Sequence, residues 1–221
     1  MEDDHVSTAY RVGDYEFSTR EVRDLLVAWA ALGVAFTIFF AGGGPNVAAL
    51  LGPSLAVLLG VSLLTAGVAF LLHEIAHKVV AVNYGQVAEF RADYSMLFLA
   101  IMSALLGFIF AAPGAVHHRG YLSEREHGHI AIAGPVMNLV LAVVFLPVYL
   151  GGVGLNLGLL VLLGQLGIIV NLFLAAFNLV PYGPLDGKTV IAWSKPVWGG
   201  TFLLSAALTY IAWTTLDISI I

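Results

Sequence analysis

The feature that most restricts the possible folds is a set of long stretches without a charged residue. They are 49, 25, 59 and 21 residues long and cover Leu25–His73, Tyr94–His118, His127–Leu185 and Pro196–Leu216. A helix needs about 20 apolar residues to cross the hydrocarbon core of a bilayer. The sequence therefore predicts an all-α polytopic membrane protein with about six transmembrane helices.

Composition excludes several classes of protein. Hydrophobic residues make up 60% of the chain and charged residues 10%, whereas soluble domains carry about a quarter charged residues. Of the 23 charges, ten lie in the first 24 residues, so we expect a polar head at 1–24 and a membrane domain at 25–221. A net charge of −5 argues against nucleic-acid binding, and the lack of cysteine excludes disulfides.

Local patterns predict structure in the head and leave one apolar segment open. Residues 10–17 contain two β-prone runs around Gly13-Asp14, which indicates a hairpin. Ser18 and Glu21 have the spacing of a capping box, so the first helix should begin there. Glycine and proline interrupt residues 42–53, and the segment 46–60 could be a short span, a re-entrant piece or an interfacial helix.

The sequence His73-Glu74-Ile75-Ala76-His77 lies inside an apolar span. Residues four apart share one face of a helix, so His73 and His77 can bind one metal ion. Glu74 is rotated off that face and can take a proton from a water that the metal activates. A simpler interpretation is an ion pair of Glu74 with Lys78 beside two core histidines, but it does not explain the histidine spacing.

A catalytic zinc needs a third protein ligand. Asp186 lies between two apolar spans and next to a helix break, and it is the best candidate. Asp186-Gly187 could also be an ordinary turn or helix cap. Four other acidic residues occupy polar loops close to the spans, namely Glu89, Asp93, Glu124 and Glu126.

Two further motifs accompany the histidine motif. Residues 178–187 read Asn-Leu-Val-Pro-Tyr-Gly-Pro-Leu-Asp-Gly, and residues 134–138 read Gly-Pro-Val-Met-Asn. Together with His73-Glu74-x-x-His77, these motifs resemble the site-2 protease family of intramembrane zinc metalloproteases, in its prokaryotic form without a PDZ or CBS domain. The resemblance covers about residues 61–187, which we take as the catalytic core.

The resemblance implies one zinc ion per chain, held by His73, His77 and Asp186, with Glu74 as catalytic base. Asn178 would be a polar group near the bound peptide or the developing oxyanion, although an interhelical hydrogen bond would also account for it. We expect Asn138 to have a structural role.

The expected function is hydrolysis of peptide bonds within or near transmembrane helices of other proteins, the reaction of regulated intramembrane proteolysis. The partners would be transmembrane substrates in a prokaryotic cell membrane. A membrane zinc transporter or metal-binding protein with the same ligands is the alternative. Transport usually requires polar groups along a path through several helices, whereas these collect at one depth.

A substrate helix must unwind before its backbone can be cleaved, and an exposed strand edge would replace the lost hydrogen bonds. The segments 89–93 and 111–116 are candidates for such short strand or re-entrant segments near the active site. The polar loop at 117–129 contains four histidines that could form a second metal site. Their irregular spacing favours a solvated loop instead; they are His117, His118, His127 and His129.

Overall fold

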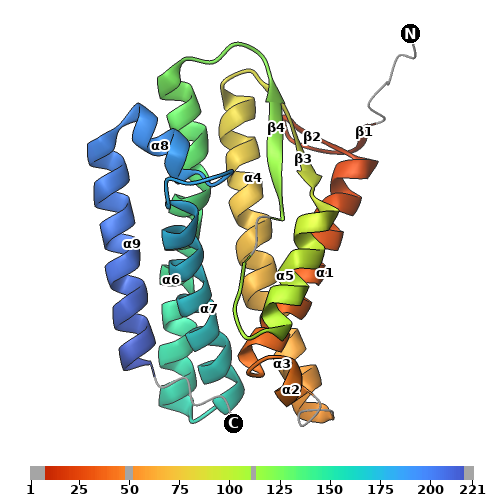
Figure 1. Ribbon diagram of the computed structural model, residues 1–221, viewed down its shortest axis with the longest axis vertical. Helices are drawn as coiled ribbons and strands as arrows, with labels where there is room; N and C mark the ends of the chain where they lie inside the picture. The colour runs from red at the N-terminus through yellow and green to blue at the C-terminus, as the bar shows by residue number, and fades with distance from the viewer. Residues whose placement is uncertain (1–7, 48–51, 111–112, 217–221) are drawn as a thin grey trace.

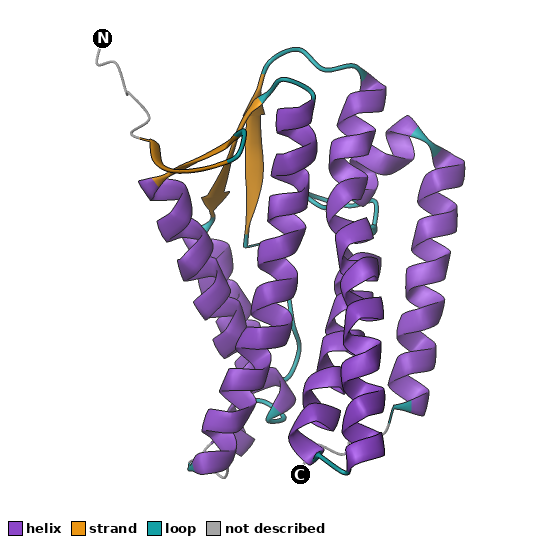
Figure 2. Ribbon diagram, turned by 180° about the vertical axis from the view of Figure 1, so that it is seen from behind, coloured by secondary structure: helices purple, strands orange, loops and turns teal. Residues whose placement is uncertain are grey.

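The computed structural model describes residues 8–47, 52–110 and 113–216. Long helices run side by side, and two small antiparallel sheets lie at one end of the bundle (Figures 1 and 2). In chain order the elements are β1 (Thr8–Val12), β2 (Tyr15–Ser18), α1 (Thr19–Phe40), α2 (Gly44–Val47), α3 (Pro53–Ser62), η2 (Leu63–Gly67), α4 (Val68–Asn83), β3 (Val87–Ala92), α5 (Tyr94–Leu105), β4 (Gly114–Arg119), α6 (Glu124–Leu155), α7 (Gly158–Asn178), α8 (Gly187–Trp193) and α9 (Lys195–Thr215).

Four helical segments are long and apolar enough to cross a bilayer: Thr19–Phe40, Ser54–Asn83, Glu124–Leu155 and Gly158–Asn178. They confirm the predicted all-α, multi-pass membrane protein. The prediction of about six spans also included α5 and α9. With 12 residues, α5 reaches only about 18 Å, less than the thickness of the hydrocarbon core. Although α9 has 21 residues, it is not among the four.

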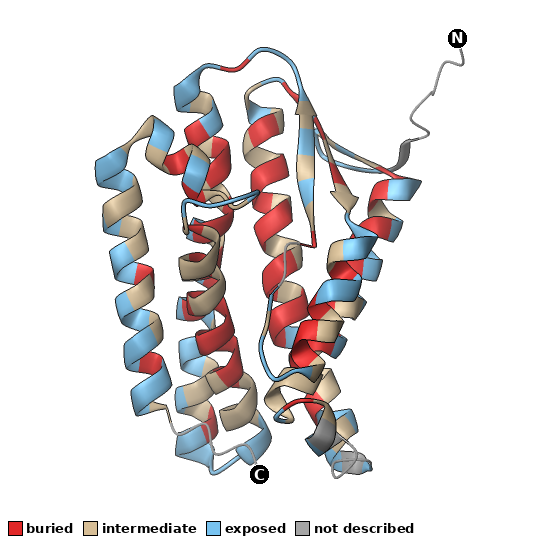
Figure 3. Ribbon diagram, in the orientation of Figure 1, coloured by how far each residue is buried: buried red, intermediate tan, exposed pale blue. Residues whose placement is uncertain are grey.

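Helix α4 lies in the middle of the molecule, between α1 and α5 on one side and α6 and α7 on the other (Figure 1). Figure 3 shows that α4 is buried along most of its length, whereas α9 is largely exposed. Small residues allow this close packing, and Ala69 and Ala81 of α4 are fully buried. Polar side chains on α4 are therefore enclosed by protein on several sides.

The segment 46–60, for which the sequence allowed three structures, is largely helical where it is described. Residues 46–47 end the short helix α2, and residues 48–51 lie outside the described residues. Residues 53–60 form most of α3, which continues through η2 into α4 as one long helix. The π-helical η2 contacts Trp29 of α1, whose indole donates to the Leu63 carbonyl at 3.0 Å. A side chain at Gly67 would lie 2.6 Å from the Trp29 ring, so glycine permits this contact.

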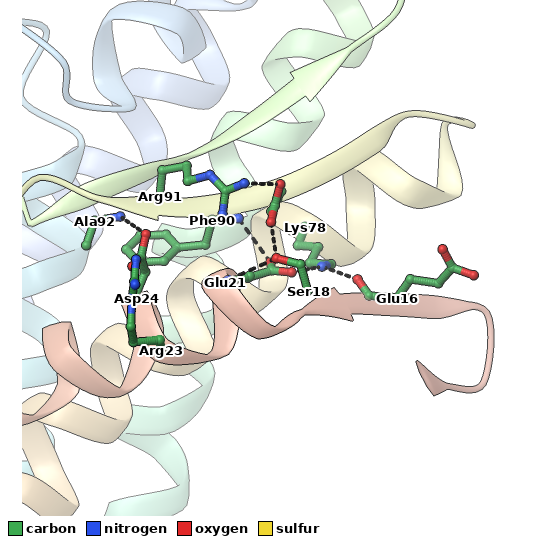
Figure 4. A network of polar contacts seen from close by, with 10 residues as sticks. Glu16, Ser18, Glu21, Arg23, Asp24, Lys78, Phe90, Arg91 and Ala92 are labelled. Atoms are coloured by element: carbon green, nitrogen blue, oxygen red, sulfur yellow. Dashed lines mark hydrogen bonds and ion pairs between the residues drawn. The ribbon is translucent and has the colours of Figure 1, made fainter. Parts of the chain in front are cut away.

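The structure confirms the hairpin of β1 and β2 and the start of α1, but it corrects the predicted capping box. The Ser18 hydroxyl accepts from the Glu21 amide at 3.0 Å, as expected. The Glu21 carboxylate instead accepts from Lys78 Nζ at 2.5 Å and from the Phe90 amide at 3.0 Å (Figure 4). Glu21 is fully buried, and a buried carboxylate needs a cation and donors of this kind.

The segment 89–93 was predicted as a loop with a possible strand edge. Residues 89–92 form most of β3, which pairs with β4, and Asp93 caps α5. Asp24 of α1 accepts from the Ala92 amide at 3.4 Å (Figure 4). Asp24 also accepts from the Tyr94 hydroxyl at 2.8 Å, and the Ser18 hydroxyl donates to Glu89. Together with the bond from Phe90 to Glu21, these contacts cover the edge of β3 that faces α1. Within the described residues, the opposite edge of this two-stranded sheet, on β4, carries no further strand.

The buried pair of Glu21 and Lys78 generates a stability prediction. In Lys78→Met the Glu21 carboxylate loses its cation while both positions stay buried, so the free energy of unfolding should fall by about 3–5 kcal/mol. The double variant Glu21→Gln/Lys78→Met removes both charges and keeps an acceptor for the Phe90 amide, and it should recover most of the loss. Reversible denaturation in mixed micelles would measure these changes.

Arg23→Met is the control, because the Arg23 side chain is 60% exposed and its pairing with Asp24 is screened by solvent. It should leave stability nearly unchanged. A Lys78→Met protein as stable as wild type would show that the buried pair is unimportant.

Candidate metal centre

Helix α4 brings His73 and His77 together one turn apart. Their Nε2 atoms are 2.9 Å from each other, and the two side chains are nearly buried, with 4% and 7% of each residue exposed. Because α4 is a regular helix through this region, the two imidazoles project from the same face. Glu74 follows His73 directly and is rotated by about 100° from it around the helix axis.

Asp186 reaches the histidines from the non-helical segment between α7 and α8. Its Oδ2 atom is 3.3 Å from His73 Nε2 and 3.4 Å from His77 Nε2. A side chain at Gly187 would lie 2.1 Å from the Leu179 carbonyl, so glycine allows the chain to fold tightly here. Asp186 occupies the turn at the N-cap position of α8 but makes no side-chain capping bond, so capping does not account for its carboxylate.

The three donor atoms have the spacing of metal ligands. Metal–ligand bonds of about 2.0–2.1 Å at tetrahedral angles separate neighbouring donors by about 3.3 Å. The observed separations are 2.9, 3.3 and 3.4 Å. Among the described residues, His73, His77 and Asp186 are the one group of histidines and acids close enough to share a metal ion. Two neutral imidazoles and a carboxylate suit a divalent metal such as zinc.

Helix α6 packs directly against the donor atoms at Gly134. A Cβ at this position would lie 2.4 Å from the Nε2 atom of His73 and 2.4 Å from that of His77. Glycine therefore keeps the space in front of both imidazoles free of a side chain. Sequence reasoning recognised the Gly-Pro-x-x-Asn segment but not this contact.

The other ring nitrogens of the two histidines also contact α6. His73 Nδ1 is 2.6 Å from the Asn138 side-chain oxygen, and His77 Nδ1 is 2.7 Å from the Ile130 carbonyl. Asn138 was expected to be structural, yet it touches a candidate ligand. The signal that could have found it is the spacing of four residues from Gly134, which places both on one face of α6.

Glu74 is not paired with Lys78, because Lys78 contacts Glu21 and the Glu16 carbonyl. The alternative in which Glu74 and Lys78 form an ion pair is therefore wrong. Glu74 is 7% exposed, and its Oε2 atom has no hydrogen-bond partner among the described residues. A buried carboxylate oxygen without a partner is costly, so its place beside three candidate ligands indicates a chemical role.

The site opens into two adjoining cavities. The larger, about 700 Å³, is lined by residues of α1, α4, α7, β3 and β4, including His73, Glu74 and Asn178. The smaller, about 190 Å³, contains all three candidate ligands. Asn178 lines both cavities and donates to the Leu174 carbonyl of its own helix at 2.9 Å. That bond lies within α7, so it does not support the interhelical alternative.

The other acidic candidates for a third ligand have different partners or positions. Glu89 pairs with Arg91 at 2.5 Å. Asp93 caps α5, and Glu126 completes a capping box with Ser123 at the start of α6. Glu124 is exposed on the first turn of α6.

The segment 117–129, predicted as a solvated loop, contains the end of β4, a loop at 120–123 and the start of α6. His118 and His127 approach each other, with ring centroids 5.2 Å apart, and line the smaller cavity. Burial, assisted by His127 and His117, lowers the pKa of the His118 imidazole. The Nδ1 atom of His129 shares a hydrogen bond with the Tyr84 hydroxyl. These histidines form no second metal-binding group within the described part of the chain.

Comparison with known proteins identifies two relatives. "Putative zinc metalloprotease MJ0611" of Methanocaldococcus jannaschii is 38% identical over 186 residues, which cover 83% of this chain and 90% of the relative. "Putative zinc metalloprotease YwhC" of Bacillus subtilis is 33% identical over 145 residues, or 58% of this chain and 66% of the relative. No family model and no solved structure matches. The chain belongs to the family of metalloproteases that these two prokaryotic proteins represent.

Proposed function

We propose that the chain is a zinc-dependent intramembrane endopeptidase of the site-2 protease type. The observation that carries this proposal is the convergence of His73, His77 and Asp186 beside the unpartnered Glu74 carboxylate, at the wall of a shared cavity. The names of the two relatives support zinc as the metal.

The depth of the site supports cleavage within the membrane. His73 lies ten residues before the end of α4 at Asn83, which corresponds to about 15 Å along the helix. This helix is part of one of the four candidate spans. Ionisable groups at such depth are rarely retained without a function.

Each residue has a role that follows from its position. Zinc held by His73, His77 and Asp186 would activate water and polarise the scissile carbonyl. Glu74 takes a proton from the attacking water while the water oxygen bonds to the carbonyl carbon. Glu74 then delivers that proton to the departing amide nitrogen as the C–N bond breaks. Asn178 lines the same cavity, where its amide can donate to the carbonyl oxygen.

The free edge of β4 is suited to hold the substrate as an added strand. The Phe90 and Ala92 amides point away from β4, toward Glu21 and Asp24. Their cross-strand partners are Val116 and Gly114. Phe90–Val116 and Ala92–Gly114 are therefore non-hydrogen-bonded pairs of the antiparallel ladder. In such a pair the amide and carbonyl of each residue point away from the partner strand. Gly114 and Val116 line the smaller cavity together with the candidate ligands, so an extended peptide bound there would place its carbonyl near the metal.

Substitution of the proposed base separates catalysis from metal binding. Glu74→Gln has nearly the same shape and is not a ligand, so it should bind zinc as wild type does and lose cleavage by at least about 10²-fold. Zinc content by mass spectrometry and cleavage of a model transmembrane peptide would be measured on the purified protein. Cleavage by Glu74→Gln at the wild-type rate would contradict the assignment.

Substitution of the third ligand should affect both properties. Asp186→Ala leaves two histidines, too few for a catalytic zinc, so metal and cleavage should be lost together.

The transporter alternative predicts a different result for the wild-type protein. It would bind zinc and move it across a vesicle membrane without cleaving peptide.

Proline at Val116 tests the strand edge. Val116→Pro removes an outward amide without touching the ladder to β3, and the loss of one hydrogen bond should lower kcat/KM about tenfold. Zinc content should not change. Val116→Ala is the matched control, because it loses the side chain and keeps the amide. Equal cleavage by both variants would refute substrate binding at this edge.

A further inference from the structure

We propose that Asn138 is a positioning residue that fixes the tautomer of His73 through a chain of buried amides. The proposal rests on the metal site described above and concerns how that site is held. A neutral imidazole carries one N–H, and only the other nitrogen can bind a metal. His73 Nδ1 must therefore carry the proton if Nε2, which faces His77 and Asp186, is to be a ligand.

The orientation of the Asn138 amide follows from its other contacts. Its nitrogen is 3.3 Å from the Ala69 carbonyl and 3.0 Å from the Asn171 side-chain oxygen. A backbone carbonyl accepts hydrogen bonds and cannot donate, so the amide nitrogen of Asn138 must be on this side. The Asn138 oxygen then faces His73 Nδ1 at 2.6 Å and requires a proton there.

Asn171 of α7 is oriented in the same way. Its nitrogen donates to the Gly167 carbonyl at 2.8 Å, which turns its oxygen toward the Asn138 nitrogen. The carbonyls of Ala69 on α4 and Gly167 on α7 can only accept hydrogen bonds. They therefore fix the donor and the acceptor in each bond of the chain that runs from Asn171 through Asn138 to His73. Asn138 and Asn171 are both fully buried, and buried amides persist where their hydrogen bonds are satisfied.

One face of α6 supports both histidines. The Ile130 carbonyl accepts from His77, Gly134 clears the space before the Nε2 atoms, and the Asn138 side chain accepts from His73. These residues are spaced by four and lie along one side of the helix. The support of His77 comes from the backbone and survives any side-chain substitution. The support of His73 depends on a single side chain and can be removed.

The experiment compares two substitutions that affect the fold and the tautomer differently. Asn138→Leu has a similar volume and no acceptor. Asn138→Asp keeps an oxygen toward His73 but cannot donate to the Ala69 carbonyl or to Asn171. Zn²⁺ affinity would be measured by chelator competition on the full chain in detergent, with the Co²⁺ absorption spectrum and the thermal unfolding temperature of each variant.

We expect Asn138→Leu to bind Zn²⁺ about 10–100-fold more weakly than wild type, the range found for lost partners of metal-ligating histidines, and to change the Co²⁺ spectrum. Asn138→Asp should unfold at a lower temperature yet bind Zn²⁺ within about threefold of wild type, because a carboxylate is also a suitable partner. Thr65→Val is the control, since it removes a buried hydroxyl that donates to the Val61 carbonyl within the same long helix. It should bind Zn²⁺ as wild type does.

A role limited to packing predicts a different result, in which affinity follows stability in all variants. Wild-type affinity in Asn138→Leu, or equal losses in Asn138→Leu and Asn138→Asp, would overturn the proposal. If the wild-type protein binds Zn²⁺ but cleaves no peptide, the proposed function is refuted and the positioning role of Asn138 still stands. Wild-type protein that binds no Zn²⁺ would overturn both.

Discussion

The architecture depends on the need to provide partners for polar side chains on one buried helix, a need that is met for His73, His77 and Lys78. His73, Glu74, His77 and Lys78 are all buried on α4 in an apolar bundle. Charged and polar groups in that setting require partners. Lys78 receives Glu21 from α1, and the histidines receive acceptors from α6 and Asp186 from the segment before α8. Neighbouring elements are thus arranged around α4 by its polar residues as well as by apolar packing.

Much of this could be predicted from sequence because its signals are local or depend on the bilayer. Apolar length indicated the long helices, and a Gly-Asp turn indicated the first hairpin. The histidine spacing depends only on helical geometry. Asp186 was singled out because few acids occur between apolar spans, and the structure places it within 3.4 Å of both histidines.

The features that were not predicted depend on partners far apart in the sequence. Glu21 fits a capping box three residues after Ser18, but its partner Lys78 is 57 residues away. A local pattern cannot show that the position will be buried, and burial decides which partner the carboxylate takes. Asn138 likewise shows its contact with His73, 65 residues away, only once α4 and α6 are packed together. Residues 89–92 and 117–119 read as polar loops because the strands to which they belong are short and, in the described part of the chain, pair with each other alone.

The π-helical turn at Leu63–Gly67 has a consequence for how the long helix is constructed. Such a turn accommodates one extra residue, which offsets the two flanking α-helical parts by about 100° around the axis. The part before it can therefore direct its apolar stripe toward α1 and α7, while the part after it directs the histidines toward α6. One inserted residue therefore lets a single helix present two differently oriented surfaces, and the half with the candidate metal ligands packs mainly against α6.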